Sequence, residues 1–330
     1  MENGRVWEGR MKRNAIRTLA GVASAIAVTM AATGASAQSN RPVTVVVPFA
    51  AGGGTDITTR AMQSGLTDAL DANIVVKNTA GAGGTLGVGE VARARADGRT
   101  LGMAPVGPLT TQPHLRALPY NIDSFDYICL AYSAPTVIAV AKDAPFSTLE
   151  EMVSHAKANP GEVTFAVQAI GSVPHIAGLA LAEAAGIEMT YLPVNGDGPA
   201  LKALLDGTAD VFIPHVSFFS SNAEQLKSLA MLQSERLKEQ PDLATAAEQG
   251  YNLDFPIWGG IVAPKGLPKE DVTRLEGACE AAVNSAPFQE RMEAVKQPSA
   301  YMGSAEFTAF VREKYETNRV LLEKAGLLSK

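Results

Sequence analysis

Several residue types that mark common kinds of functional site are scarce in this chain of 330 residues. It has only 2 cysteines, 4 histidines and 6% aromatic residues. The histidines, His114, His155, His175 and His215, show no spacing typical of metal ligands, so we expect no metal site. Basic residues number 28 and acidic residues 34. A chain with this acidic balance binds nucleic acid poorly, and we expect no nucleic-acid partner.

The first 37 residues have the pattern of a secretory signal peptide. A basic stretch precedes an uncharged apolar run over 19–32, and Ala35-Ser36-Ala37 is a small-residue cleavage site. A retained membrane anchor is the alternative, but the apolar run is shorter than the ~20 residues that span a bilayer. We therefore expect cleavage of residues 1–37 and a mature chain that works outside the cytoplasm. Met1 and Met11 are both candidates for the start of translation.

Export decides how the two cysteines can be interpreted. An oxidising compartment permits a disulfide between Cys129 and Cys279. Cys279 also shares one face of a predicted helix with Leu275 and Val283, which suits a small buried hydrophobic residue. Both interpretations stay open at this point: a disulfide, or two buried thiols.

Predicted strands and helices alternate along the mature chain. The first unit reads as strands over 43–47, 73–77 and 100–104, with helices over 55–70 and 85–96 between them. This β-α-β-α-β order indicates a doubly wound, mostly parallel sheet.

A second unit of the same kind begins near residue 163, and predicted helices over 269–285 and 304–325 close the chain. We expect an α/β fold of two lobes, with residues 38–141 and 259–330 in the first and 142–258 in the second. Two such lobes leave a crevice at the carboxyl ends of their strands, where ligands tend to bind.

Four junctions between a predicted strand and the next helix are rich in glycine or other small residues. They are 50–56, which contains the triplet Gly52-Gly53-Gly54, and 80–85, 169–175 and 195–199. Glycine lets the backbone approach a ligand, and a helix N-terminus carries free N–H groups and a partial positive charge. One such junction is an ordinary turn, but four at one edge indicate a site for a small anion.

Nucleotide and catalytic sites do not fit these loops. Ile57 and Leu86 stand where a dinucleotide fingerprint needs its third glycine, and no Gly-Lys-Ser/Thr follows either loop. Ser172 and His175 are three residues apart at a helix start, without a nucleophile elbow. We therefore expect no catalytic residue and no cofactor. An exported enzyme with His175 as base is the alternative, and it needs a nucleophile beside the ring and a third, orienting group.

Together these motifs resemble the Bug family, or TctC-like proteins, which are periplasmic solute-binding proteins of tripartite tricarboxylate transporters. The resemblance covers essentially the whole mature chain. Its matching segments are VPFAAGGGTDITTR at 47–60, GAGGTLGVGEVARARADGRTL at 81–101, GSVPHIAG at 171–178, LPVNGDGPALKALLDGTADV at 192–211 and WGGIVAPKGLP at 258–268.

The resemblance implies a Venus-flytrap fold, a periplasmic location and no enzymatic activity. It further implies that the chain captures a small organic carboxylate, either a di- or tricarboxylate or an aromatic acid. The expected partners are that ligand and the membrane permease subunits of a tripartite tricarboxylate-type transporter, and we expect a monomer. A sensor subunit that presents its ligand to a membrane receptor is a further alternative.

The resemblance also indicates which residues would hold the ligand. In the family, main-chain amides and waters of the first loop hold a carboxylate, and a loop like 171–175 meets a second group. The residues that this places at the ligand are Phe49, Ala50, Gly53, Thr55 and Asp56 from the first lobe, and Ser172, Val173, Pro174, His175, Asn195, Gly196, Asp197 and His215 from the second.

The second lobe departs from the family pattern, and we expect it to set the ligand preference. Val194-Asn195-Gly196-Asp197 replaces the usual Tyr-Lys-Gly-Gly, so a tyrosine hydroxyl is lost and an acid appears. Pro214-His215 replaces the usual Asp-Asn. His215 donates to the anion if it faces the crevice; otherwise it is a packed histidine at a strand end.

Overall fold

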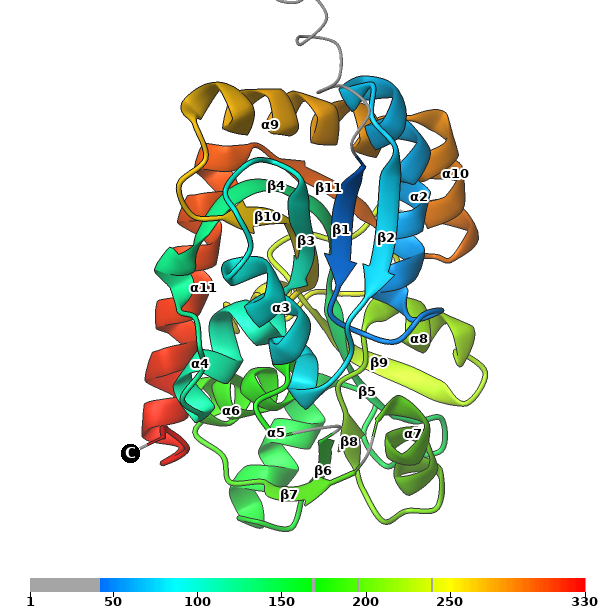
Figure 1. The fold of residues 1–330 in the computed structure, drawn as a ribbon. Coiled ribbons are helices and arrows are strands. Elements are labelled where there is room, and N and C mark those ends of the chain that lie inside the picture. The colour runs from blue at the N-terminus through cyan, green and yellow to red at the C-terminus, as the bar shows by residue number, and fades with distance from the viewer. Residues whose placement is uncertain (1–41, 168–169, 195, 239, 330) are drawn as a thin grey trace, which may run out of the picture.

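A computed structural model describes residues 42–167, 170–194, 196–238 and 240–329, so the predicted signal peptide lies outside the described residues. The described chain forms two lobes, each built on one sheet, which confirms the expected two-lobed α/β fold (Figure 1). The sheet of the first lobe has the strand order β11-β4-β10-β3-β1-β2, and that of the second lobe β7-β6-β8-β5-β9.

The strands of the first lobe are β1 (Val43–Val47), β2 (Ile74–Asn78), β3 (Thr100–Pro105), β4 (Phe125–Ala134), β10 (Ile257–Pro264) and β11 (Ser299–Met302). The strands of the second lobe are β5 (Thr136–Ala141), β6 (Thr164–Val167), β7 (Thr190–Pro193), β8 (Val211–Phe212) and β9 (Leu226–Leu232).

Both sheets are mixed, so the expected parallel pairing holds for only part of each. β1 pairs in parallel with β2 and β3, and β6 with β7 and β8. β10 is antiparallel to β3 and β4, and β5 is antiparallel to β8 and β9. The reason is the path of the chain: β5 and β10 enter their sheets from the other lobe, through the edge at which the parallel strands end.

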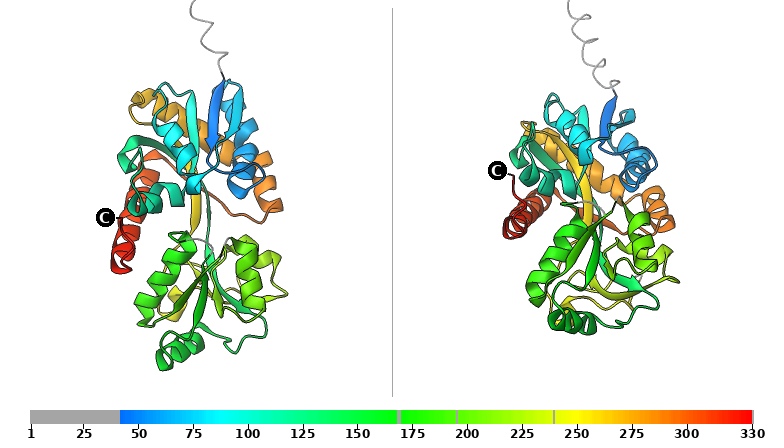
Figure 2. Two further views of the ribbon diagram at one scale, coloured as in Figure 1. Left: turned by 60° about the horizontal axis from the view of Figure 1, so that its bottom comes forward. Right: turned by 90° about the horizontal axis from the view of Figure 1, so that it is seen from below.

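The chain first changes sheets between Ala134 and Thr136, earlier than the boundary expected after residue 141. Residues Thr136–Ala141 form β5 of the second sheet, so their expected assignment to the first lobe is wrong. The return occurs just before β10, close to the expected boundary at 259. The two crossing segments touch, because the Thr136 hydroxyl donates to the Phe255 carbonyl at 2.9 Å and Ile257 pairs with Ala134. Figure 2 shows these segments between the lobes.

Helices cover both faces of each sheet. Those of the first lobe are α2 (Gly54–Leu70), α3 (Thr85–Ala92), α4 (Gln112–Leu115), α9 (Lys269–Val283), α10 (Ala286–Ala294) and α11 (Ser304–Lys324). Those of the second lobe are α5 (Leu149–Ala158), α6 (Val173–Ala185), α7 (Asp197–Leu205) and α8 (Val216–Ser221). The α10 helix and strand β11 were not among the elements predicted from the sequence.

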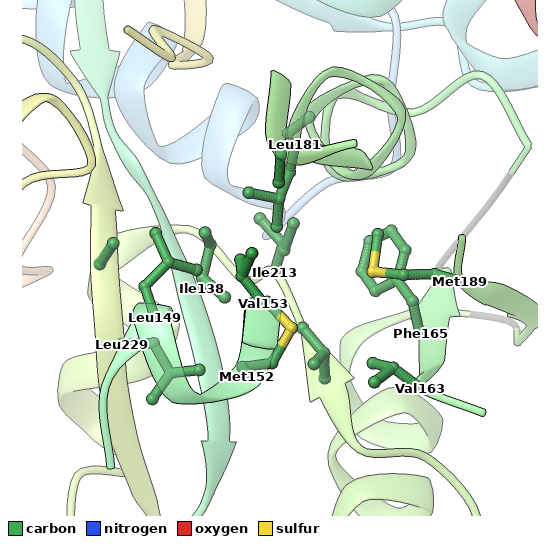
Figure 3. Packing of buried hydrophobic residues seen from close by; sticks show 14 of the residues in the cluster. Ile138, Leu149, Met152, Val153, Val163, Phe165, Leu181, Met189, Ile213 and Leu229 are labelled. Atoms are coloured by element: carbon green, nitrogen blue, oxygen red, sulfur yellow. The ribbon is translucent and has the colours of Figure 1, made fainter. Parts of the chain in front are cut away.

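Each lobe has its own hydrophobic core on each face of its sheet. In the second lobe, Leu149 and Met152 of α5 pack with Phe165 of β6 and Leu181 of α6 (Figure 3). α5 starts with a capping box, in which Thr148 and Glu151 each satisfy a backbone N–H of the other. Each lobe therefore has its own packed core, and Val173 of the second lobe joins a cluster of the first.

Cys129 of β4 and Cys279 of α9 form a disulfide, which settles the question left open by the sequence. Both side chains are fully buried in the core between α9 and the first sheet. The bond joins positions separated by 150 residues and so encloses the entire second lobe. Within the described part of the chain, no helix is both long and apolar enough to cross a bilayer.

Candidate functional site

The loop that follows β1 leaves a helix N-terminus open toward the other lobe. Gly52 has a φ of 84°, a backbone conformation that favours glycine, and Ala50 to Gly54 are exposed. Helix α2 begins at Gly54, and no side chain caps it. The N–H groups of the first residues of a helix have no partner within it. The amides of Gly54, Thr55 and Asp56 are therefore available to an anion at the positive end of the helix.

Asp56 holds this loop in shape. Its carboxylate accepts from the Gly52 N–H at 2.9 Å, from Arg60 Nε at 3.0 Å and from Asn78 Nδ2 at 2.9 Å. Asn78 also donates to the Phe49 carbonyl at 3.0 Å. The side chain of Asp56 is thus committed to the protein and is buried. It acts as a positioning residue of the loop, so only its backbone N–H is left for an anion.

The environment of Asp56 lowers its pKa. Burial alone would raise the pKa, but hydrogen bonds from Arg60, Gly52 and Asn78 favour the charged form and outweigh it. The stabilisation is therefore fully present above the unfolded-state pKa of about 4 and is lost as the pH falls through the lowered folded-state pKa.

We expect Asp56→Asn to lower the free energy of unfolding at pH 7 by about 1–3 kcal/mol, because a charged acceptor is lost. The difference between variant and wild type should narrow below pH ~4, where Asp56 of the wild type takes up a proton. Urea unfolding at pH 7 and at pH 3 measures both values. A difference that is the same at the two pH values would show that the charge of Asp56 has no stabilising role.

Thr55 connects the first loop to the crossing strands. Its hydroxyl lies 3.5 Å from the hydroxyl of Tyr132, which is buried on β4 close to the point where the chain leaves the first lobe. Burial raises the pKa of Tyr132 to about 12, so the hydroxyl stays protonated. Gly259 of β10 lies against this ring, and a Cβ there would stand 2.5 Å from Tyr132 Cε1. The first loop and the crossing segments are therefore in direct contact.

In the second lobe, the loop at 171–175 packs against the first lobe. A Cβ at Gly171 would stand 3.3 Å from Cγ2 of Thr111 and even closer to Leu115, both from the first lobe. Val173 is buried in the hydrophobic cluster that also contains Trp258 of β10. This loop was expected at the ligand, and the structure places it at the boundary between the lobes.

The N-terminus of α6 offers fewer free amides than the sequence suggested. The Ser172 hydroxyl accepts from the His175 N–H at 3.3 Å, which caps the helix, and Pro174 has no N–H. Only the amide of Val173 is left in the first turn. The four junctions were expected to bring free amides to one site, but this junction contributes few, because Ser172 caps one N–H and Pro174 has none.

His175 is a poor candidate for a catalytic base. The Gly171 N–H donates to His175 Nδ1 at 3.0 Å, so the neutral ring carries its proton on Nε2. Burial lowers the pKa of His175 to about 4, and the ring packs edge-on against Tyr191. The Ser172 hydroxyl bonds to the backbone of His175 and not to its ring. Among the described residues, this histidine has neither the nucleophile nor the orienting acid that an enzyme would require.

Asp197 and His215, at the starts of α7 and α8, lie close together in the second lobe. Asp197 Oδ2 is 3.6 Å from His215 Nε2, and both side chains are about one-third exposed. His215 Nδ1 accepts from the Phe218 N–H at 3.2 Å and so caps α8. Gly196 precedes α7 with a φ of 99°. Asn195 lies outside the described residues.

A cavity of about 650 Å³ separates the lobes beside the first loop. Val216, Phe219 and Ser220 of α8 line one wall, and Met292, Lys296 and Gln297 line the other. None of the described residues of the four glycine-rich junctions lines this cavity. Its connection to the first loop is Gln297, whose Oε1 lies 3.7 Å from the Cβ position of Gly54. Its volume falls in the range of small-molecule sites.

Sequence reasoning missed Asn78, Tyr132 and the α10–β11 segment. Asn78 ends β2, next to β1 in the sheet, so the rule that sites gather at the carboxyl ends of strands could have indicated it. Tyr132 and Gln297 carry no such signal, because only the folded chain brings them to the loop. Within the described residues there is also no cluster of three or more His, Cys, Asp or Glu that could hold a metal ion.

Comparison with known proteins agrees with this architecture. The family model for the tripartite tricarboxylate transporter family receptor (TctC) matches residues 58–327. A UPF0065 protein from the tcbD-tcbE intergenic region of Pseudomonas sp. (strain P51) is 33% identical over 289 residues, which are 85% of this chain and 84% of that protein.

Three solved structures share the fold. A TctC solute-binding protein from Polaromonas without ligand has a TM-score of 0.79 at 26% identity, covering 87% of this chain and 99% of the other. Rpa4515 of R. palustris with adipate has a TM-score of 0.73 at 25% identity, covering 88% and 98%. MatC of Rhodopseudomonas palustris with bound malate has a TM-score of 0.69 at 29% identity, covering 86% and 99%. With a family model that spans most of its length, the chain belongs to the TctC family of tripartite tricarboxylate transporter receptors.

Proposed function

We propose that this chain captures a small organic carboxylate between its lobes and delivers it to the membrane subunits of a tripartite tricarboxylate-type transporter. The observation that carries the proposal is the uncapped N-terminus of α2, where the amides of Gly54, Thr55 and Asp56 have no partner within the helix. Adipate and malate in the two solved relatives are ligands of the same class. The proposed location is the periplasm, in agreement with the predicted signal peptide.

The proposed mechanism is closure of the lobes around the ligand. A carboxylate first binds the amides of α2 in the first lobe, and the second lobe contacts the ligand only when the cleft closes. The ligand therefore favours the closed state over the open one. The contact of Thr136 with Phe255 supports a hinge in the crossing segments, where the two connections between the lobes meet. Recognition through amides adds no buried ion pair that release would have to break.

Binding of a carboxylate panel tests the proposal. The protein, purified from the periplasm of an expression host, is heated with dicarboxylates, tricarboxylates, aromatic acids, amino acids and sugars. A ligand at ~100 times its dissociation constant stabilises the folded state by ~2.7 kcal/mol, which gives a clear shift in Tm. We expect a shift with one class of carboxylate. A Tm shift with sugars only would contradict the proposal. So would the absence of any Tm shift in protein that was first denatured and refolded to remove a resident ligand.

Ser172→Ala tests the contribution of the second lobe. We expect a loss of about 1 kcal/mol of stability, because the variant lacks the cap of α6. We also expect weaker ligand binding, because the hydroxyl proton is a donor at the lobe boundary. Thr148→Ala is the matched control: it removes the exposed cap of α5 in the same lobe and should leave affinity unchanged. Equal affinities in the two variants, measured by calorimetry, would exclude Ser172 from the site.

A further inference from the structure

Gln112 carries a buried polar atom that lacks a partner. It is the first residue of α4, and its side chain is only 9% exposed. Among the described residues, Gln112 Oε1 is the one buried side-chain nitrogen or oxygen without a hydrogen bond. Leaving a buried acceptor unsatisfied costs about 1–3 kcal/mol. Native proteins nearly always satisfy such groups, with the protein itself, water or a ligand.

The position of Gln112 explains what could reach it. A Cβ at Gly83 would stand 3.6 Å from Gln112 Cδ and 3.8 Å from Oε1, so the amide lies against the second glycine loop. The next residue of that loop, Gly84, lies against the ring of Phe49, with a Cβ position 3.2 Å from Cζ. The amide is thus adjacent to the loop that leads into α2.

The second lobe contacts the neighbours of Gln112. Thr111, the neighbour of Gln112 in the chain, and Leu115, one turn further on, both pack against Gly171. Helix α4 and the residue before it therefore contact two loops: the Gln112 amide lies against Gly83, and Thr111 and Leu115 lie against Gly171. The inference needs a ligand that extends from the amides of α2 past the second glycine loop, which contacts both Phe49 and Gln112.

The chemistry of the amide restricts the group that it can bind. A carbonyl oxygen needs a donor, and neither an ionised carboxylate nor a keto group supplies one. An ammonium group would donate, but it would bring a charge that a neutral amide does not compensate. A hydroxyl group suits the amide in either orientation, since it can donate to the oxygen or accept from the nitrogen.

We infer that Gln112 hydrogen-bonds a hydroxyl group of the bound acid, so that the chain prefers hydroxy carboxylates over the same acids without the hydroxyl. This inference rests on the proposed function and names the ligand class of that site. Gln112 is a specificity-determining residue of the first lobe, although the sequence led us to expect specificity from the second.

Matched pairs of acids that differ by one hydroxyl test the inference. Malate and succinate form one pair, and 3-hydroxybutyrate and butyrate, and a hydroxybenzoate and benzoate, form two more. In calorimetry, the wild type should bind the hydroxy member of its preferred pair at least about tenfold more tightly than the member without the hydroxyl. This factor corresponds to the free energy of one hydrogen bond to a buried group. Gln112→Met keeps the size of the side chain but removes the amide, and it should reduce this ratio to about one.

Gln63→Met is the control. Gln63 Nε2 donates to the Ile74 carbonyl at 2.8 Å, away from the glycine loops, so this variant loses an amide without touching the site. It should keep the wild-type ratio. Gln112→Met should keep its Tm, because removing an unsatisfied buried atom costs little.

Three results would overturn the inference while the proposed function stands. The first is equal wild-type affinity for the two members of each pair. The second is an unchanged affinity ratio in Gln112→Met. The third is an equal loss of affinity in Gln112→Met for both members of a pair, which would indicate a resident water or a carboxylate contact. If no acid of any pair and no other carboxylate bound the wild type, the proposed function itself would fail, and this inference with it.

Discussion

Gly53→Val is expected to abolish carboxylate binding while the protein stays folded. Gly53 has a φ of −76° and a ψ of 164°, which any residue adopts, and a Cβ would meet only the Ala50 carbonyl, at 3.5 Å. The variant therefore fits the backbone. The two methyl groups of valine would project from an exposed position directly before the free amides of α2. Losing two hydrogen bonds to a charged group costs about 3 kcal/mol or more, which is about 100-fold or more in Kd.

The control for this variant is a valine at an open glycine elsewhere in the first lobe. Gly277 of α9 is exposed, and no atom lies within 4 Å of its Cβ position. Gly277→Val should bind ligand like the wild type, and calorimetry measures both. If Gly53→Val bound its ligand with wild-type affinity, the carboxylate would have to be held away from the first loop.

Removal of the disulfide is expected to cause the largest change in stability. The double variant Cys129→Ala, Cys279→Ala leaves no unpaired thiol and frees a loop of 150 residues in the unfolded chain. Chain-entropy arguments give about 4–5 kcal/mol for a loop of this size. The affinity for ligand should hardly change, because both cysteines lie in the core between α9 and the first sheet, away from the loops.

Urea unfolding, followed by circular dichroism, measures this loss, and wild-type protein unfolded with a reductant provides a second route to the same value. The two losses of stability should agree, apart from a small further loss in the double variant that comes from the buried cavities left by alanine. A double variant as stable as the wild type would contradict the prediction. A variant of normal stability with lost affinity would instead place the bond at the site.

The fold could be predicted from the sequence wherever local pattern decides it. Strands β1, β2 and β3 and the helices between them follow from apolar runs and glycine-rich turns. The direction of β10 and the membership of β5 could not be predicted, because both depend on where the chain crosses between the lobes. The short α10 and β11 were missed because their register is set by packing against α2 and β4 and not by a strong local pattern.

Part of the candidate site could likewise be predicted from the sequence, and part depends on the folded chain. The loop before α2 was recognisable because its glycine triplet lies between a predicted strand and a predicted helix and recurs with three similar junctions. Asp56, Ser172 and His215 were expected at the ligand, but in the structure their side chains turn back to hold or cap the backbone. For His215, the sequence indicated only a strand end and not the start of α8. The role of Gln112 was invisible in the sequence, since it depends on which loops surround it after folding.

The central claim is that the amides at the start of α2 hold the carboxylate. Titration of ¹⁵N-labelled protein with its best ligand, followed by backbone amide NMR, tests it directly. The account predicts large downfield proton shifts for Gly54, Thr55 and Asp56, because their N–H groups gain a charged acceptor. If these three resonances stayed in place while resonances elsewhere in the cleft moved, the carboxylate would be bound by other groups and the account would be wrong.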